Sequence, residues 1–115
     1  RYGVLGGGKR LRPIMVMESA RLFNVDPNKA RRVAAALEFV HFYSLIHDAL
    51  PAMDDSDLPR RHPSVHRKYV EATAILAGDA LQARALEHLA AADVAATLRV
   101  DWLATLAQAS GAAGM

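Results

Sequence analysis

A glycine-rich segment followed by basic residues, Gly6 to Pro13, has the composition of an anion-binding site. If a helix begins near residue 11, its N-terminus presents backbone N–H groups and a positive dipole end to an anion. Lys9 and Arg12 are three residues apart, so on a first helical turn they lie on the same side and add two cationic donors. Because the Walker spacing is absent, the segment indicates either a different phosphate site or a flexible basic N-terminus.

A second group of polar residues lies on a helix predicted over residues 28–48. His41, Ser44 and Asp48 follow Leu37 at helical spacing, which places all of them on one face. A histidine or an aspartate facing a bundle interior carries a desolvation cost unless a partner or a metal compensates for it. His41 is therefore either functional or a satisfied core histidine. Asp48 is either functional or an acid at a frayed helix end.

The segment after this helix concentrates acidic residues. Its four carboxylates, within ten residues, are those of Asp48, Asp54, Asp55 and Asp57. Carboxylates this close repel one another, and a hard cation such as Mg²⁺, bound together with a substrate phosphate, relieves the repulsion. Arg60 and Arg61 follow, and opposite charges flanking one loop suit a metal–phosphate clamp. A transition-metal site with His47, His62 and His66 and a solvated acidic loop are the alternatives.

The composition indicates that helices position these residues. The chain has 115 residues, enough for one domain with a modest core. Its 23 alanines stand against 7 glycines and 5 prolines, a balance that favours helices over a many-stranded sheet. Cysteine is absent, which excludes disulfides, cysteine-ligated zinc and cysteine nucleophiles. The sequence has no apolar run of membrane-spanning length and no signal-peptide pattern, so we expect a cytoplasmic protein.

The apolar periodicity predicts helices over residues 11–23, 28–48, 70–92 and 94–110, with a long polar connection over residues 51–68. Asp26 is expected to cap the second helix, with Pro27 at its first position. One face of the third helix carries Ala72, Ile75, Leu76, Asp79, Ala83 and Leu86. The predicted fold class is therefore all-α, a helical bundle or a piece of one.

Three segments resemble motifs of the trans-isoprenyl diphosphate synthases, the polyprenyl synthetase family, in their bacterial farnesyl-type form. Residues 7–13 (GGKRLRP) are similar to the family's basic segment, residues 41–55 to its first aspartate-rich motif, and residues 71–81 to the helix that follows. The resemblance runs essentially from end to end. It implies an incomplete isoprenoid-synthase-type fold, in which residues 1–115 are the N-terminal part of a single isoprenoid synthase domain.

The resemblance also implies a prenyl transfer and the residues that serve it. Those that would hold substrates and metal are Gly8, Lys9, Arg12 and His41 for isopentenyl diphosphate, Arg60 and Arg61 as further substrate-binding residues, and Asp48 and Asp54 for Mg²⁺. Tyr43 and Ser44 would limit product length, and an aromatic residue there favours a C15 product. Metal and arginines would stabilise the leaving diphosphate while the isopentenyl double bond attacks the allylic cation. The implied assembly is a homodimer.

The sequence departs from the family pattern in three respects. Ala49 stands where the second of two paired aspartates is expected. Pro59 takes the place of the first of two arginines, so that Arg60 occupies the place of the second and Arg61 that of a glycine. The family's second aspartate-rich motif falls beyond Met115, so we expect these residues alone to be inactive and to expose apolar faces.

The alternative to an enzyme is a non-catalytic helical relic or a partner subunit of a prenyl synthase, and Ala49 and Pro59 favour it. Nucleic-acid binding through the basic residues 60–68 is not expected. The net charge is only +2, and the neighbouring acidic segment opposes contact with a phosphate backbone.

Overall fold

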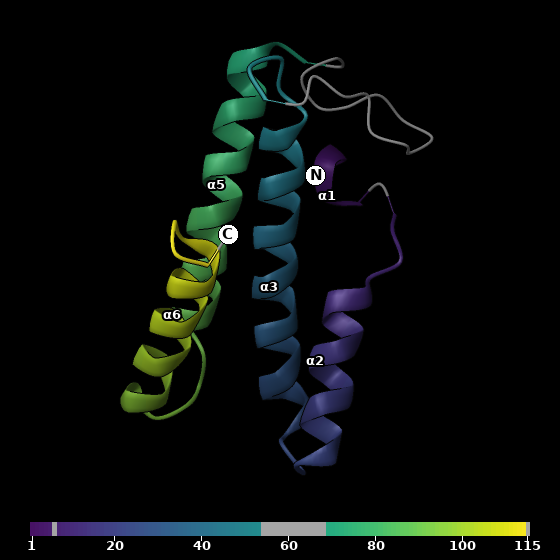
Figure 1. Cartoon of the computed structure of the whole chain (residues 1–115). Helices are drawn as coiled ribbons and strands as arrows, with labels where there is room; N and C mark the ends of the chain where they lie inside the picture. The colour runs from purple at the N-terminus through teal and green to yellow at the C-terminus, as the bar shows by residue number, and fades with distance from the viewer. Residues whose placement is uncertain (6, 54–68, 115) are drawn as a thin grey trace. The chain divides into compact units, whose positions relative to one another are not determined.

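The computed structural model describes residues 1–5, 7–53 and 69–114, and this part of the chain consists of helices and their connections, with no strand (Figure 1). The helices are α1 (Tyr2–Leu5), α2 (Leu11–Leu22), α3 (Pro27–Asp48), α5 (Glu71–Ala90) and α6 (Ala96–Ser110). The all-α prediction is confirmed, and α2, α3, α5 and α6 match the predicted ranges to within two residues at each end. The short α1 was not predicted. None of the described helices combines the length and the apolar character needed to cross a membrane.

The turn between α2 and α3 follows from its residue types. Asn24 has a φ of 54°, the left-handed conformation that asparagine tolerates after a helix end. The N–H of Val25 donates to the Ala20 carbonyl oxygen at 2.9 Å, which closes the last turn of α2. Asp26 Oδ1 then accepts the N–H of Asn28 at 2.9 Å, and Pro27 is the first residue of α3. The predicted cap is therefore confirmed.

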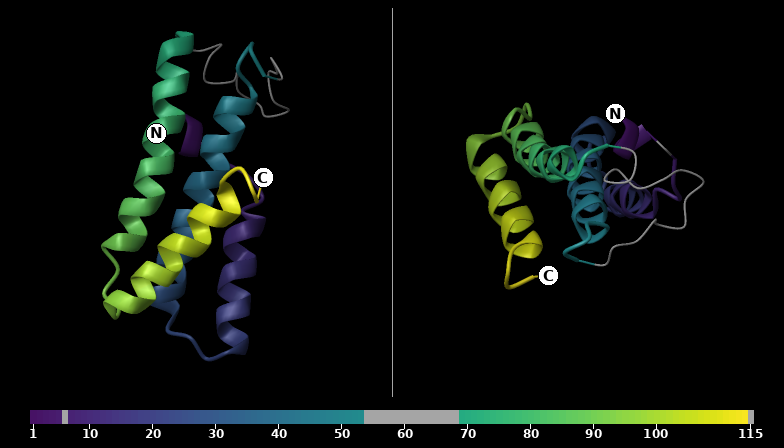
Figure 2. Two further views of the ribbon diagram at one scale, coloured as in Figure 1. Left: turned by 60° about the vertical axis from the view of Figure 1, so that its left-hand side comes forward. Right: turned by 90° about the horizontal axis from the view of Figure 1, so that it is seen from above.

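The chain forms two compact units, and α3 and α5 contribute to both. The first unit comprises residues 1–9 and 39–83, so it contains the end of α3 and most of α5. These two helical segments lie side by side and run in opposite directions, as Figure 1 and Figure 2 show. Ile46, Leu50 and Ala74 form the buried cluster between them, and Leu81 packs against it.

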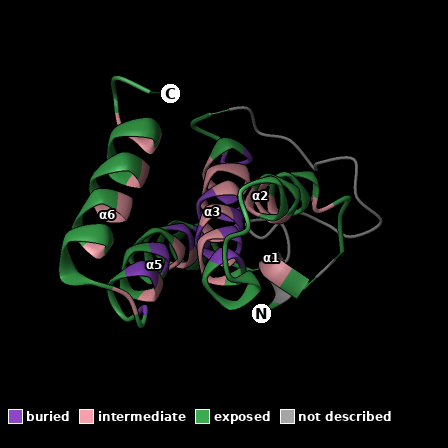
Figure 3. Cartoon of the chain, turned by 90° about the horizontal axis from the view of Figure 1, so that it is seen from below, coloured by how far each residue is buried: buried purple, intermediate pink, exposed green. Residues whose placement is uncertain are grey.

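The second unit comprises residues 10–38 and 84–115. Its core is built from small side chains, and the buried residues on α3 and α5 include Ala30, Ala34, Ala36, Ala85 and Leu89. The Arg32 guanidinium donates from Nη1 to the carbonyl oxygen of His88 at 2.9 Å, so the start of α3 and the end of α5 are in direct contact. α2 and α6 belong to the same unit and have no buried residue (Figure 3).

The face of α5 that packs is not the face predicted from the apolar periodicity. The residues of the predicted face, all of them exposed, are Ala72, Ile75, Leu76, Asp79, Ala83 and Leu86. In the first unit, Ile75 is 40% and Leu76 66% exposed, whereas Ala74 and Gly78 are buried. The neighbouring helix decides this, because the end of α3 brings Ile46 and the His47 ring against α5, where the small residues Ala74 and Gly78 leave room for them. The periodicity predicts the helix correctly but does not identify the face that packs.

Candidate functional site

The basic segment leads directly into α2. Gly7 has a φ of 85°, a conformation readily available to glycine, and Gly8 and Lys9 are exposed. Arg12 is exposed in the first turn of α2. The helix starts where the anion-site prediction requires it to start, so backbone N–H groups and cationic side chains occur in the same short segment.

The C-terminal part of α3 carries the predicted residues His41, Tyr43 and Ser44 within one turn. His41 is half-buried, and its ring centroid lies 5.8 Å from that of the buried Phe42. Ser44 donates its hydroxyl to the His41 carbonyl oxygen at 2.8 Å, so this side chain bonds to the backbone of its own helix. Tyr43 is half-buried and meets the ring of His47 edge-on, with a centroid separation of 5.1 Å.

His47 joins α3 to α5 one residue before Asp48. Its Nε2–H donates to the carbonyl oxygen of Ile75 at 2.9 Å, and Asp79 Oδ1 lies 3.6 Å from the same nitrogen. The ring rests on Gly78, where a Cβ atom would come within 2.1 Å of Nε2. Sequence reasoning did not assign Gly78 a role, although a glycine inside a long helix is a signal of close packing.

Asp48 and Ala49 face different surroundings although they are neighbours. Asp48 is the last residue of α3 and its side chain is exposed, whereas Ala49 is 1% exposed and lies beside the buried Leu50. The C-terminal end of a helix carries a partial negative charge, which favours a cation there. Asp48 is therefore well placed for a cation, and a side chain at position 49 points into the packed interior.

The donor chemistry of this end of α3 fits Mg²⁺, which prefers carboxylate oxygens. The exposed Asp48 carboxylate would be one such ligand, while Asp54, Arg60 and Arg61 lie outside the described residues. Among the residues that the structure does describe, no group of three or more His, Cys, Asp or Glu side chains is arranged to hold an ion. The Nε2 proton of His47 points at the Ile75 carbonyl oxygen, which leaves Nδ1 as its possible metal ligand, and His62 and His66 lie outside the described residues, so the transition-metal alternative stays open.

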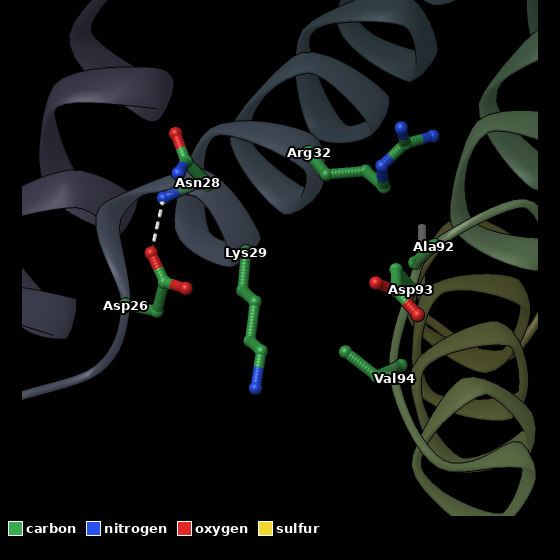
Figure 4. A pocket seen from close by; sticks show the side chains of 7 residues that line it. All are labelled: Asp26, Asn28, Lys29, Arg32, Ala92, Asp93 and Val94. Atoms are coloured by element: carbon green, nitrogen blue, oxygen red, sulfur yellow. Dashed lines mark hydrogen bonds between the residues drawn. The ribbon is translucent and has the colours of Figure 1, made fainter.

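A cleft of about 300 Å³ lies in the second unit, at the N-terminal end of α3 (Figure 4). Its lining residues are Asp26, Asn28, Lys29, Arg32, Ala92, Asp93 and Val94. The lining mixes both signs of charge, and Asp26 and Arg32 are already bonded within the protein, to the Asn28 N–H and the His88 carbonyl oxygen. No predicted site residue lines the cleft.

The chain matches a known family and curated members of it. The family model described as polyprenyl synthetase matches residues 1–112. The chain is 52% identical over 118 residues to the farnesyl diphosphate synthase of Escherichia coli, and 43% identical over 115 residues to geranylgeranyl pyrophosphate synthase 4 of Arabidopsis thaliana. Both alignments cover 100% of this chain, but 40% of the first relative and 31% of the second. The chain thus spans less than half the length of these relatives.

Solved structures give the same result for the fold. The crystal structure of an FPP/GFPP synthase from Zymomonas mobilis matches with a TM-score of 0.94 and 49% identity, over 100% of this chain and 42% of that one. A geranyltransferase from Legionella pneumophila matches with a TM-score of 0.91 and 48% identity, over 96% of this chain and 40% of that one. The helices described here are therefore part of an isoprenyl synthase fold.

Proposed function

Because the chain belongs to the polyprenyl synthetase family, we propose that it is the N-terminal part of a short-chain prenyltransferase that joins isopentenyl diphosphate to an allylic diphosphate. The observation that carries this proposal is the match over residues 1–112, at 52% identity to a farnesyl diphosphate synthase. The start of α2 and the end of α3 support it, because they carry the cationic and acidic residues that the reaction uses.

The basic segment is proposed to bind isopentenyl diphosphate. Gly8 lets the backbone approach the ligand closely, and Lys9 and Arg12 are exposed cations at the N-terminus of α2. His41 is the fourth proposed ligand, and its half-buried position on α3 limits the water around the group it binds. Charge-assisted hydrogen bonds of this kind are about twice as strong as neutral ones.

The acidic segment is proposed to hold the metal and the allylic substrate. Asp48 and Asp54 would ligate Mg²⁺ bound to the allylic diphosphate, and Arg60 and Arg61 would bind substrate diphosphate. When bound, the metal supplies positive charge that stabilises the leaving diphosphate. The carbon–oxygen bond breaks with its electron pair on the diphosphate, the isopentenyl double bond attacks the allylic cation, and loss of a proton completes the product.

Product length is proposed to depend on Tyr43 and Ser44. Tyr43 packs on the His47 ring, which is itself fixed against α5, so its bulk is held in place and favours a C15 product. A homodimeric assembly and a cytoplasmic location stay predictions.

The rival proposal, a non-catalytic relic or partner subunit, depends on Ala49 and Pro59. The burial of Ala49 weakens it, since alanine at that position removes no exposed carboxylate beside Asp48. Pro59 lies outside the described residues, so it still favours the rival.

A chimaera tests the proposal against its rival. This chain replaces the segment it matches in the Escherichia coli farnesyl diphosphate synthase, and the product formed from isopentenyl and geranyl diphosphates with Mg²⁺ is measured. We expect C15 product, and we expect Asp48→Asn to lower the rate by about 100-fold or more. Asp101→Asn, at an exposed aspartate of α6, is the matched control and should have no effect. A folded chimaera without product would support the rival.

A further inference from the structure

Arg10 differs in its contacts from the basic residues Lys9 and Arg12 that precede and follow it. Its Nη1 donates to Glu38 Oε1 at 2.7 Å, a contact between the start of α2 and the middle of α3. Glu38 is buried, with 9% of its surface exposed. Lys9 and Arg12, in contrast, are exposed. An ion pair with one buried partner differs energetically from a surface pair, because loss of the cation leaves an uncompensated charge in the interior.

The backbone of Arg10 also determines where α2 begins. Arg10 has φ 51° and ψ 35°, a left-handed conformation that is unfavourable for a residue with a Cβ atom. Its carbonyl oxygen accepts the N–H of Ile14 at 3.1 Å, the first backbone bond of the helix. A strained conformation of this kind persists only where the surrounding structure holds it, and the bond to Glu38 supplies such a restraint.

We propose that Arg10 is a positioning residue whose ion pair with Glu38 anchors the start of α2 and so orients Lys9 and Arg12 toward a diphosphate. Arg10 itself does not bind the diphosphate, because its guanidinium serves the buried carboxylate. The proposal rests on the proposed function, since it concerns the same isopentenyl diphosphate site. It divides the three basic residues of the segment into two ligands and one anchor.

Matched variants of the chain test this division. Arg10→Gln, Glu38→Gln and the double variant are compared for isopentenyl diphosphate binding by calorimetry and for hydrogen exchange of the Ile14 amide. We expect each single variant to weaken binding at least tenfold and to lower Ile14 protection, and the double variant to be no worse than the singles. Arg21→Gln and Glu18→Gln remove an exposed pair on the same helix, with Nη1 and Oε2 3.4 Å apart, and should change neither quantity.

The controls separate anchoring from direct binding. Lys9→Gln should weaken ligand binding and leave Ile14 protection unchanged. If Arg10→Gln unfolds the chain, Arg10→Lys keeps the charge but loses the planar fork, and it should lower Ile14 protection by less than Glu38→Gln does.

Two results would overturn the proposal. In the first, Glu38→Gln binds isopentenyl diphosphate as tightly as the wild type although Arg10→Gln binds it weakly. In the second, neither Arg10→Gln nor Glu38→Gln changes the protection of the Ile14 amide. If the wild-type chain does not bind isopentenyl diphosphate, the proposed function fails, and Ile14 exchange still decides whether the pair anchors α2.

Discussion

At the scale of single residues, the end of α3 shows why adjacent positions in a motif carry different constraints. Asp48 faces solvent, whereas Ala49 is 1% and Leu50 7% exposed. Alanine suits position 49 because its methyl group fills a packed space without bringing in a charge. The family resemblance alone suggests a weakened metal site, whereas the structure shows that the alanine at this position lies in the packed interior.

Introducing a carboxylate at position 49 is therefore expected to harm the fold. Ala49→Asp should lower the free energy of unfolding by about 1–3 kcal/mol, because the carboxyl group is buried without a partner. Urea denaturation measures the change, and Ala52→Asp, at an exposed position in the turn after α3, is the control. An Ala49→Asp variant as stable as the wild type would contradict this account.

His88, near the end of α5, couples stability to pH. Burial lowers the pKa of His88 from its usual 6.5, the positive charges of Arg32 and Arg84 lower it further, and Glu87 opposes them. The folded chain therefore binds the His88 proton more weakly than the unfolded chain. The stability that neutral His88 contributes is fully present above pH 6.5 and is lost as the pH falls through the folded pKa.

The pH dependence is tested by replacing the titrating group. The two conditions are pH 7.5, roughly one unit above the ordinary histidine pKa, and pH 5, more than one unit below it. Between them the wild type should lose more unfolding free energy than His88→Gln. The comparison uses urea denaturation of both proteins at each pH, so that titrations shared by the two cancel. Identical losses would show that His88 does not contribute.

At the scale of elements, the contact between α3 and α5 depends on one glycine. The His47 ring occupies the space above Gly78, and its bond to the Ile75 carbonyl oxygen fixes the end of α3 against the start of α5. A helix-interior glycine costs about 1 kcal/mol relative to alanine. The close approach of the two helices offsets this cost.

Gly78→Ala reverses the usual effect of such a substitution. Because the new Cβ atom would lie 2.1 Å from His47 Nε2, we expect a net loss of about 1–3 kcal/mol of unfolding free energy in spite of the better helix propensity. In a His47→Ala background the same change should stabilise the chain, since the obstacle is gone. Thermal unfolding of the four proteins completes the cycle. Stabilisation by Gly78→Ala alone would refute the contact.

The sequence predicts the elements well because helix formation depends on local signals. Asp26, Pro27 and Asn24 mark the turn between α2 and α3 through their own side chains and backbone preferences. The left-handed Arg10 at the start of α2 was not predictable, because arginine has no local preference for that conformation and its partner Glu38 lies 28 residues away.

At the scale of the whole molecule, large apolar side chains are exposed on several helices and next to their ends. Among them are Leu22 at 81%, Phe23 at 80%, Val70 at 70%, Leu76 at 66% and Val100 at 61% exposure. Exposed apolar surface of this kind marks interaction sites or causes association. The observation agrees with the expectation of exposed apolar faces, in a chain that spans about 40% of its bacterial relatives.

We therefore expect the isolated chain to self-associate. Sedimentation velocity should show a weight-average mass that rises with protein concentration, and the double variant Leu22→Gln, Phe23→Gln should shift this rise to higher concentration. Lys29→Gln, at an exposed polar position, should leave it unchanged. A monomer at every concentration would show that these side chains do not drive association.

The sequence by itself determined the helical class, the helix ends and the family, because these depend on neighbouring residues and on motif spacing along the chain. It also proposed Gly8, Lys9, Arg12, His41 and Asp48 as site residues, which stay predictions. Only the tertiary structure decided which face of α5 packs, that Ala49 is interior, and that Arg10 pairs with a buried carboxylate. The physical reason is distance along the chain. The Arg10–Glu38 and His47–Ile75 contacts each join residues 28 positions apart, and no local pattern encodes such a pairing.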